Sequence, residues 1–102
     1  PEIENYFSVG NGMAVTLNMA NEMECFTLSD RATYLHLKPN LDLKMTEFTD
    51  EILMNPYSII QLNTTKEKQS IAIELETYLT SDIVTSKIEN FTINNEQSFF
   101  VS

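Results

Sequence analysis

The triplet Ser29-Asp30-Arg31 places a cation between a short apolar run and a helix-start signal. In open α/β sheets, ligands lie beyond the carboxyl ends of strands, where such a strand-to-helix switch would be. An arginine there can bind an oxyanion through two parallel N–H groups. The alternative is a surface ion pair of Arg31 with Asp30 or with a glutamate. The triplet is therefore a candidate anion-binding position.

A second candidate is the helix start at Gly10–Met13, where the chain has its only two glycines. The free N–H groups of a helix start and the positive end of the helix dipole favour anions. The alternative is a tight turn that only leads into a helix. Both candidates would supply hydrogen-bond donors to an anion.

Other chemistry has little support. His36 has no cysteine or histidine at ligand spacing, which argues against a zinc site. The single cysteine, Cys25, cannot form an internal disulfide and is expected in a buried strand. The chain contains no nucleophile elbow, phosphate-binding loop or dinucleotide fingerprint. A hydrolase built on paired carboxylates is an alternative without a positioned pair. We therefore predict no enzyme activity and no cofactor.

The charge balance is strongly acidic. The 102 residues include 15 acidic and 6 basic side chains, giving a formal net charge of -9. This argues against a nucleic-acid partner and against an anionic membrane surface. A solvated acidic surface is the simplest interpretation, with a cationic partner or a metal as alternatives. No apolar run approaches the roughly 20 residues of a membrane helix. No signal peptide is recognisable. The length of the chain suits one small domain.

The elements that would position these residues alternate between helices and strands. Periodicity and capping residues predict four helices, with Ser29 or Asp30 capping the second and Thr80 or Ser81 the fourth. Short apolar or alternating runs predict strands. The helices are expected at 13–23, 31–38, 70–79 and 82–91, and the strands at 6–9, 25–28, 41–45 and 57–62. A loop is expected at 63–69 and a turn at Asn94-Asn95. This order predicts an α/β fold with a small mixed sheet flanked by helices.

Two long blocks and two shorter ones resemble a known family. The stretch from Gly10 to Glu22 is followed by Thr27-Leu-Ser-Asp-Arg-Ala-Thr-Tyr-Leu35, then by Asn55-Pro-Tyr-Ser-Ile-Ile60 and the tail Gln97-Ser-Phe-Phe100. Together they resemble the tungstate-binding (substrate-binding) proteins of ABC importers. The resemblance extends from about residue 6 to residue 101. Asn11, Ala32 and Ser58 depart from the family's usual residues.

The resemblance implies a partial periplasmic-binding-protein-like (type II) fold. Such proteins have two α/β lobes that close on an oxyanion, and they are over twice as long as this chain. Residues 1–54 would be part of the second lobe. Residues 55–102 would be the return strand and the carboxyl-terminal helices, which would pack on the first lobe.

The resemblance also implies a function, which is a solute-binding component of an ABC importer that binds tungstate or molybdate in an inter-lobe cleft. The oxyanion-binding residues would be Arg31, Ser29, Thr33, Gly12 and Met13. A membrane permease would be the partner, and the location would be periplasmic or extracellular and membrane-anchored. The alternative is a stand-alone small α/β interaction domain that binds no anion. In either case we expect the fragment to form a homo-oligomer, because helices 70–79 and 82–91 would expose apolar faces.

Overall fold

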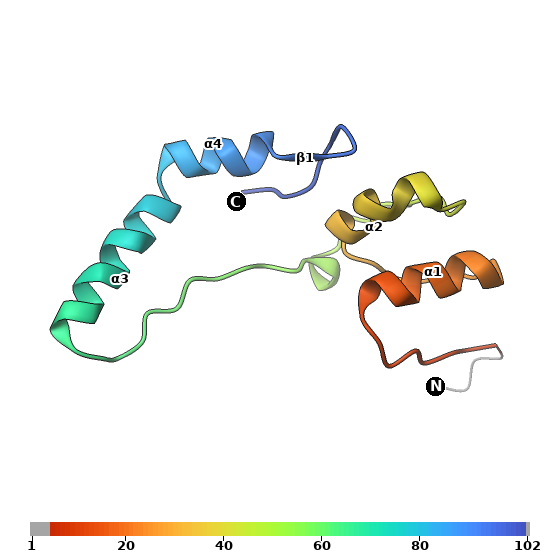
Figure 1. Cartoon of the computed structure of the whole chain (residues 1–102), viewed down its shortest axis with the longest axis horizontal. Coiled ribbons are helices and arrows are strands. Elements are labelled where there is room, and N and C mark those ends of the chain that lie inside the picture. Colours follow the sequence, from red (N-terminus) through yellow and green to blue (C-terminus); the bar gives the residue numbers. More distant parts are fainter. Residues whose placement is uncertain (1–4, 102) are drawn as a thin grey trace. The chain divides into compact units, whose positions relative to one another are not determined.

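The computed structural model describes residues 5–101 and divides the chain into two compact units, Pro1–Glu47 and Phe48–Ser102. Figure 1 shows the helices of each unit and the short hairpin near the carboxyl terminus. The combination of helices with a two-stranded sheet agrees with the predicted α/β class. No helix in the described part of the chain is both long and apolar enough to cross a membrane.

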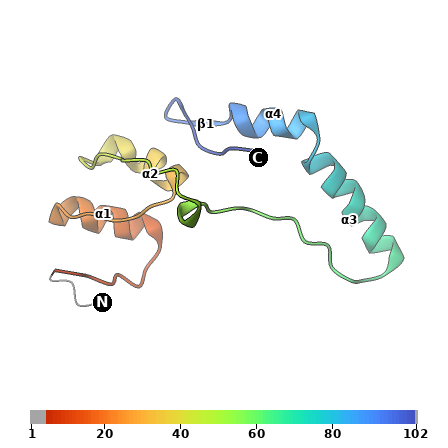
Figure 2. The same ribbon diagram turned by 180° about the vertical axis from the view of Figure 1, so that it is seen from behind.

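Unit 1 is built on two helices that run side by side. They are α1 (Met13–Met23) and α2 (Arg31–Leu37), and α2 continues into the 3-10 helix η1 (Lys38–Asn40). The sequence predicted both helices, α1 with the same bounds. Figures 1 and 2 show from opposite sides that α1 and α2 begin at the same end of the unit. The two helices pack through buried apolar side chains, namely Leu17, Ala20, Tyr34 and Leu35.

Local hydrogen bonds define the ends of these helices. Asp30 caps α2, as one of the two predicted alternatives, and its side chain accepts from the backbone N–H of Thr33. Glu24 adopts a left-handed conformation with φ of 55° after α1, and its N–H donates to the carbonyl oxygens of Ala20 and Asn21. This left-handed cap satisfies carbonyls that the last turn would leave without a donor. The chain can then turn back toward the start of α2.

The segment after η1 is held against the two helices by two hydrogen bonds. The backbone N–H of Asp42 donates to Asn21 Oδ1 of α1 at 2.8 Å. The hydroxyl of Tyr34 in α2 donates to the carbonyl oxygen of Leu43 at 2.9 Å. These bonds fix the path of the chain shortly before it reaches Glu47, the last residue of unit 1.

Unit 2 contains two helices in succession, followed by a hairpin. After the short 3-10 helix η2 (Glu51–Leu53) come α3 (Lys66–Leu79) and α4 (Asp82–Asn90). α3 begins within the predicted loop at 63–69, because the Thr65 hydroxyl caps it by accepting from the N–H of Lys68. Sequence periodicity missed this polar first turn, whose helical state depends on the cap.

The hairpin pairs β1 (Thr92–Ile93) with β2 (Glu96–Gln97) in antiparallel fashion. Its turn is the predicted Asn94-Asn95, with φ of 49° and 67°. Two-residue hairpin turns favour positive φ at both positions, and asparagine tolerates this conformation. After the hairpin, the Phe99 ring contacts Tyr57 and Phe91, with ring centroids 6.3 and 6.2 Å apart.

The predicted strands at 6–9, 25–28, 41–45 and 57–62 are not formed, so the expected mixed sheet is wrong for this structure. Within residues 5–101 the hairpin is the only sheet. A strand exists only where a neighbour accepts and donates its backbone hydrogen bonds, and none of these segments forms such a ladder. Cys25, expected to be buried in a strand, is only half-buried.

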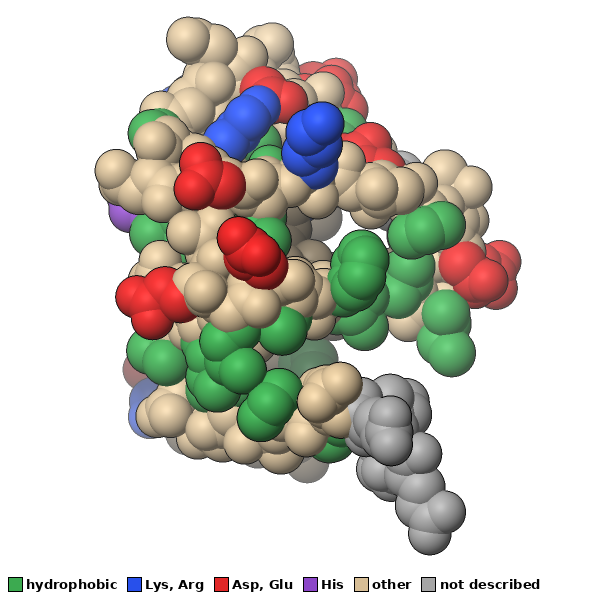
Figure 3. All heavy atoms as spheres, turned by 90° about the vertical axis from the view of Figure 1, so that its right-hand side faces the viewer, with side chains coloured by type: hydrophobic (Ala, Val, Ile, Leu, Met, Phe, Trp, Pro, Cys, Tyr) green, Lys and Arg blue, Asp and Glu red, His purple; other side chains and the backbone are tan. Residues whose placement is uncertain are grey.

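Many apolar side chains are exposed, as predicted for the two carboxyl-terminal helices. Ile71, Leu75 and Tyr78 of α3 are more than half exposed, and so are Phe26 and Ile60 in the extended segments. Figure 3 shows hydrophobic side chains on the surface of the face that it draws, together with scattered acidic groups. Such surface is typical of a protein that packs against further structure.

Candidate functional site

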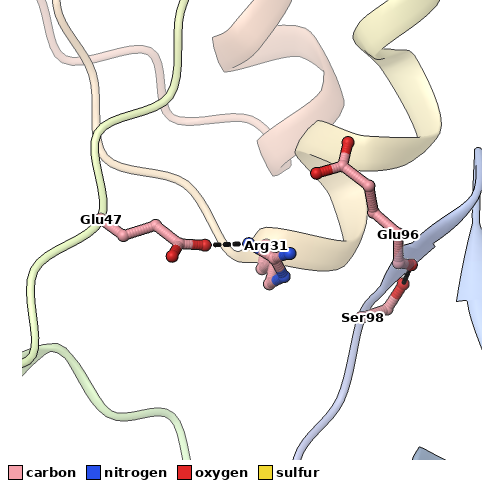
Figure 4. A network of polar contacts seen from close by, with 4 residues as sticks. All are labelled: Arg31, Glu47, Glu96 and Ser98. Carbon is pink, nitrogen blue, oxygen red and sulfur yellow. Dashed lines mark hydrogen bonds and ion pairs between the residues drawn. The ribbon is translucent and has the colours of Figure 1, made fainter.

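Arg31 is the first residue of α2, and its Nη1 forms an ion pair with Glu47 Oε1 (Figure 4). The Arg31 side chain is 24% exposed and that of Glu47 63%. The ion pair with a glutamate that the sequence left open as an alternative is therefore present. The partner is sixteen positions away in the sequence, so the fold brings the two residues together. Figure 4 also shows, in unit 2, the Ser98 hydroxyl donating to the Glu96 carbonyl.

The residues around Arg31 form a hydrogen-bonded cap. Asp30 Oδ2 accepts from the backbone N–H of Thr33 at 2.9 Å and from the Thr33 hydroxyl at 2.8 Å. The hydroxyl of Ser29 donates to the carbonyl oxygen of Asp30 at 2.8 Å. The hydroxyl protons of Ser29 and Thr33 are thus used within the cap, and an anion would have to compete for them. Their predicted role as anion ligands stays a prediction.

The glycine-flanked start of α1 has its own local geometry. Gly12 is the N-cap residue without a side-chain cap, and its carbonyl oxygen accepts from the backbone N–H and hydroxyl of Thr16. Of the two glycines, only Gly10 has a positive φ, of 64°, so that position favours glycine. No atom lies within 4 Å of a Cβ built on Gly12. The N–H groups that follow Gly12, beginning with that of Met13, are among those a helix start leaves without an intrahelical partner.

All five predicted site residues lie at one end of unit 1. Arg31 and Thr33 are in the first turn of α2 and Ser29 precedes it, while Gly12 and Met13 begin α1. Figures 1 and 2 agree that both helix starts are at this end. The arrangement offers one guanidinium and backbone N–H groups, which can bind an anion. Among the described residues, no group of histidine, cysteine and carboxylate side chains could hold a metal ion.

Sequence reasoning did not identify Glu47. It lies in the polar stretch 46–51, which has no helical or strand period, and no motif marks its carboxylate as a partner for Arg31. Only the path of the segment after α2, fixed by the hydrogen bonds of Asp42 and Leu43, brings it there.

Unit 1 also has an open groove of about 430 Å³. It is lined by the extended segments 5–10 and 25–28 and by side chains of α1, including Thr16 and Met19. Arg31 does not line it. The groove follows two of the segments that were predicted to be strands, and its lining mixes polar with apolar side chains and includes no charged group.

The chain is similar to the tungstate-binding protein TupA of Peptoclostridium acidaminophilum, with 41% identity over 68 residues, which are 67% of this chain and 24% of that protein. It is also similar to an ABC transporter anion-binding protein of Haloferax volcanii, with 36% identity over 103 residues. That match covers 93% of this chain and 30% of the relative, so the chain spans less than a third of the length of either protein.

No family model and no solved structure matches the chain. Both relatives are named as binding proteins rather than enzymes, as the sequence predicted for this chain. The resemblance inferred from the sequence blocks is therefore confirmed, and the chain is related to a part of the anion-binding proteins of ABC transporters, among them a tungstate-binding protein.

Proposed function

We propose that the chain is part of the solute-binding component of an ABC importer and contributes to binding an oxyanion such as tungstate or molybdate. Arg31 supplies the charge, and the N–H groups at the start of α1, beginning with that of Met13, supply further donors. Ser29 and Thr33 hold the cap that positions Arg31 and can turn their hydroxyl groups toward the anion. The start of α1 is open at Gly12, where nothing lies within 4 Å of the position that a Cβ would take.

The observation that supports this proposal most directly is the ion pair of Arg31. Its guanidinium already binds a carboxylate, Glu47, which presents two oxygens much as an oxyanion does. The net charge of -9 does not oppose such binding strongly, because exposed charges farther than about 10 Å are screened at ordinary salt. Donors at short range then dominate the interaction with the anion.

In the whole protein, we propose that residues 1–54 belong to the second lobe of a type II binding fold. Residues 55–102 would return to the first lobe and pack on it. The exposed apolar side chains of α3 support this, since they would be covered there. The anion would lie in the cleft between the lobes, the permease would be the partner, and the protein would act in the periplasm or outside the cell, anchored to the membrane.

The alternative, a self-associating interaction domain without an anion, is not favoured by the names of the two relatives. Self-association of this chain stays a prediction of its exposed apolar surface. Sedimentation at several concentrations would measure it.

Titration of tungstate into the chain, followed by NMR, tests the proposed function. Arg31 is the only arginine, so its Nε–H resonance is assigned without ambiguity. We expect saturable shifts of this resonance and of the Met13 amide, with a dissociation constant in the millimolar range or tighter. Arg31→Gln should abolish the shift at Met13.

Lys44→Gln is the matched control, because it removes the same charge from an exposed position of unit 1. It should leave the titration nearly unchanged. Equal losses in both variants would mean that tungstate responds only to overall charge, and shifts confined to lysine-rich parts of the chain would contradict the site.

A further inference from the structure

We propose that Glu47 sets the anion affinity of the Arg31 site, because its carboxylate occupies the guanidinium until an oxyanion displaces it. This inference rests on the proposed function and adds a competing group within the chain itself. The carboxylate and the oxyanion would use the same Nη1 donor of Arg31. They therefore compete for the donors of that atom.

The geometry makes Glu47 the partner that leaves. The Arg31 side chain is mostly buried and begins a capped helix, whereas that of Glu47 is 63% exposed on a segment without regular structure. This segment is fastened to the helices at Asp42 and Leu43. Glu47 is four residues beyond the second hydrogen bond, so its side chain can swing into water without disturbing either.

The strength of the pair limits the size of the effect. Exposed ion pairs are weak, because water and salt screen them and holding two long side chains costs entropy. A closed pair lowers the apparent affinity by the fraction of molecules in which Glu47 is not bound to Arg31. A pair of ordinary strength for an exposed site would weaken anion binding by up to about fivefold.

Two measurements on the full chain test the proposal, with Glu47→Gln as the variant and Asp42→Asn as its control. Both variants remove one negative charge from the same segment, and the Asp42 side chain is exposed. The first measurement is the dissociation constant for tungstate, from the NMR titration. The second, made without any anion, is the rate at which phenylglyoxal modifies the chain's only arginine.

We expect Glu47→Gln to bind tungstate about two- to fivefold more tightly and to be modified faster by a similar factor. Asp42→Asn should change neither quantity by more than a small part of this. Unchanged affinity in Glu47→Gln, with tungstate still bound at Arg31, would overturn the inference and leave the proposed function standing. An equal gain in Asp42→Asn would also overturn it, because general charge would then explain the effect.

Absence of tungstate binding in every variant would overturn the proposed function and this inference with it. If no variant binds tungstate, the modification rate still tells whether the ion pair of Arg31 and Glu47 forms in solution. A faster rate in Glu47→Gln would then show a pair that shields Arg31 without serving an anion site.

Discussion

The cap of α2 gives the sharpest prediction, because one carboxylate both stabilises the helix and positions Arg31. Asp30→Ala removes the acceptor for two hydrogen bonds from Thr33, to its backbone N–H at 2.9 Å and to its hydroxyl at 2.8 Å. An N-cap of this kind contributes about 0.5–2 kcal/mol, and the hydroxyl bond adds roughly 1 kcal/mol before any relaxation. We expect a loss of about 2 kcal/mol in the stability of α2.

Amide hydrogen exchange measures this loss of stability within α2 itself. Opening of α2 should become about 30-fold more frequent, since 1.36 kcal/mol corresponds to a factor of about ten. The amides of Leu35 and Leu37 report it, while those of α3 in unit 2 serve as an internal reference. Asp30→Asn keeps an acceptor and should exchange nearly as the natural chain does.

A second cap provides the comparison that could refute the reasoning. Thr65 caps α3 through a longer bond, 3.4 Å from its hydroxyl oxygen to the N–H of Lys68. Thr65→Ala should therefore cost only about 0.5 kcal/mol, at the low end for a cap. If Asp30→Ala accelerates exchange in α2 no more than Thr65→Ala does in α3, the Asp30 hydrogen bonds do not hold the helix start.

Anion binding adds a test in which two effects have opposite signs. Removing the charge of Asp30 should by itself favour an anion at the neighbouring Arg31, whereas loosening the first turn should weaken binding by misplacing the guanidinium. We expect the loss of positioning to dominate, so that Asp30→Ala binds tungstate more weakly than Asp30→Asn. Tighter binding by Asp30→Ala would show that Arg31 does not depend on the cap.

Two further predictions concern the packing of unit 1. Tyr34→Phe removes the hydrogen bond to the Leu43 carbonyl and should lower the stability of unit 1 by about 0.5–1.5 kcal/mol. Faster hydrogen exchange and lower order parameters in residues 41–47 would show this loss. Unchanged values would mean that the bond does not hold the segment. Leu35→Ala empties a position with 0% exposure and should cost about 2–5 kcal/mol. NMR should then show unit 1 largely unfolded with the α3 and α4 resonances retained, whereas a native-like unit 1 would contradict its reliance on this small core.

Helices were predictable from the sequence because their hydrogen bonds are local. The apolar spacing after Gly12 gave α1 with its correct bounds, and the Asp30 cap gave the start of α2. The turn at Asn94-Asn95 was also readable, since its residue types suit positive φ. The first turn of α3 was missed because Lys66–Gln69 has no apolar period, and only the cap at Thr65 reveals it.

The strands and the ion pair could not be predicted in the same way, because both depend on residues distant in sequence. The runs at 25–28 and 57–62 have the composition of strands, yet a strand also needs a neighbour. The position of Glu47 depends on hydrogen bonds made by Asn21 and Tyr34, which no periodicity contains. Residue types thus indicated the candidate cation, Arg31, while its partner required the folded path of the chain.

The failed strands and the exposed apolar side chains have one explanation under the proposed function. Segments such as Tyr57–Leu62 combine β-branched residues with wide exposure, which is what a strand looks like when its sheet is supplied from elsewhere. In each relative, the part outside the match is more than twice as long as the matched part. That is long enough to supply such a sheet. Arg31 differs from these segments, because Asp30 and Thr33, its neighbours in sequence, hold the start of its helix. Under the proposed function its position would not depend on a second lobe, and anion binding should therefore be measurable on this chain alone.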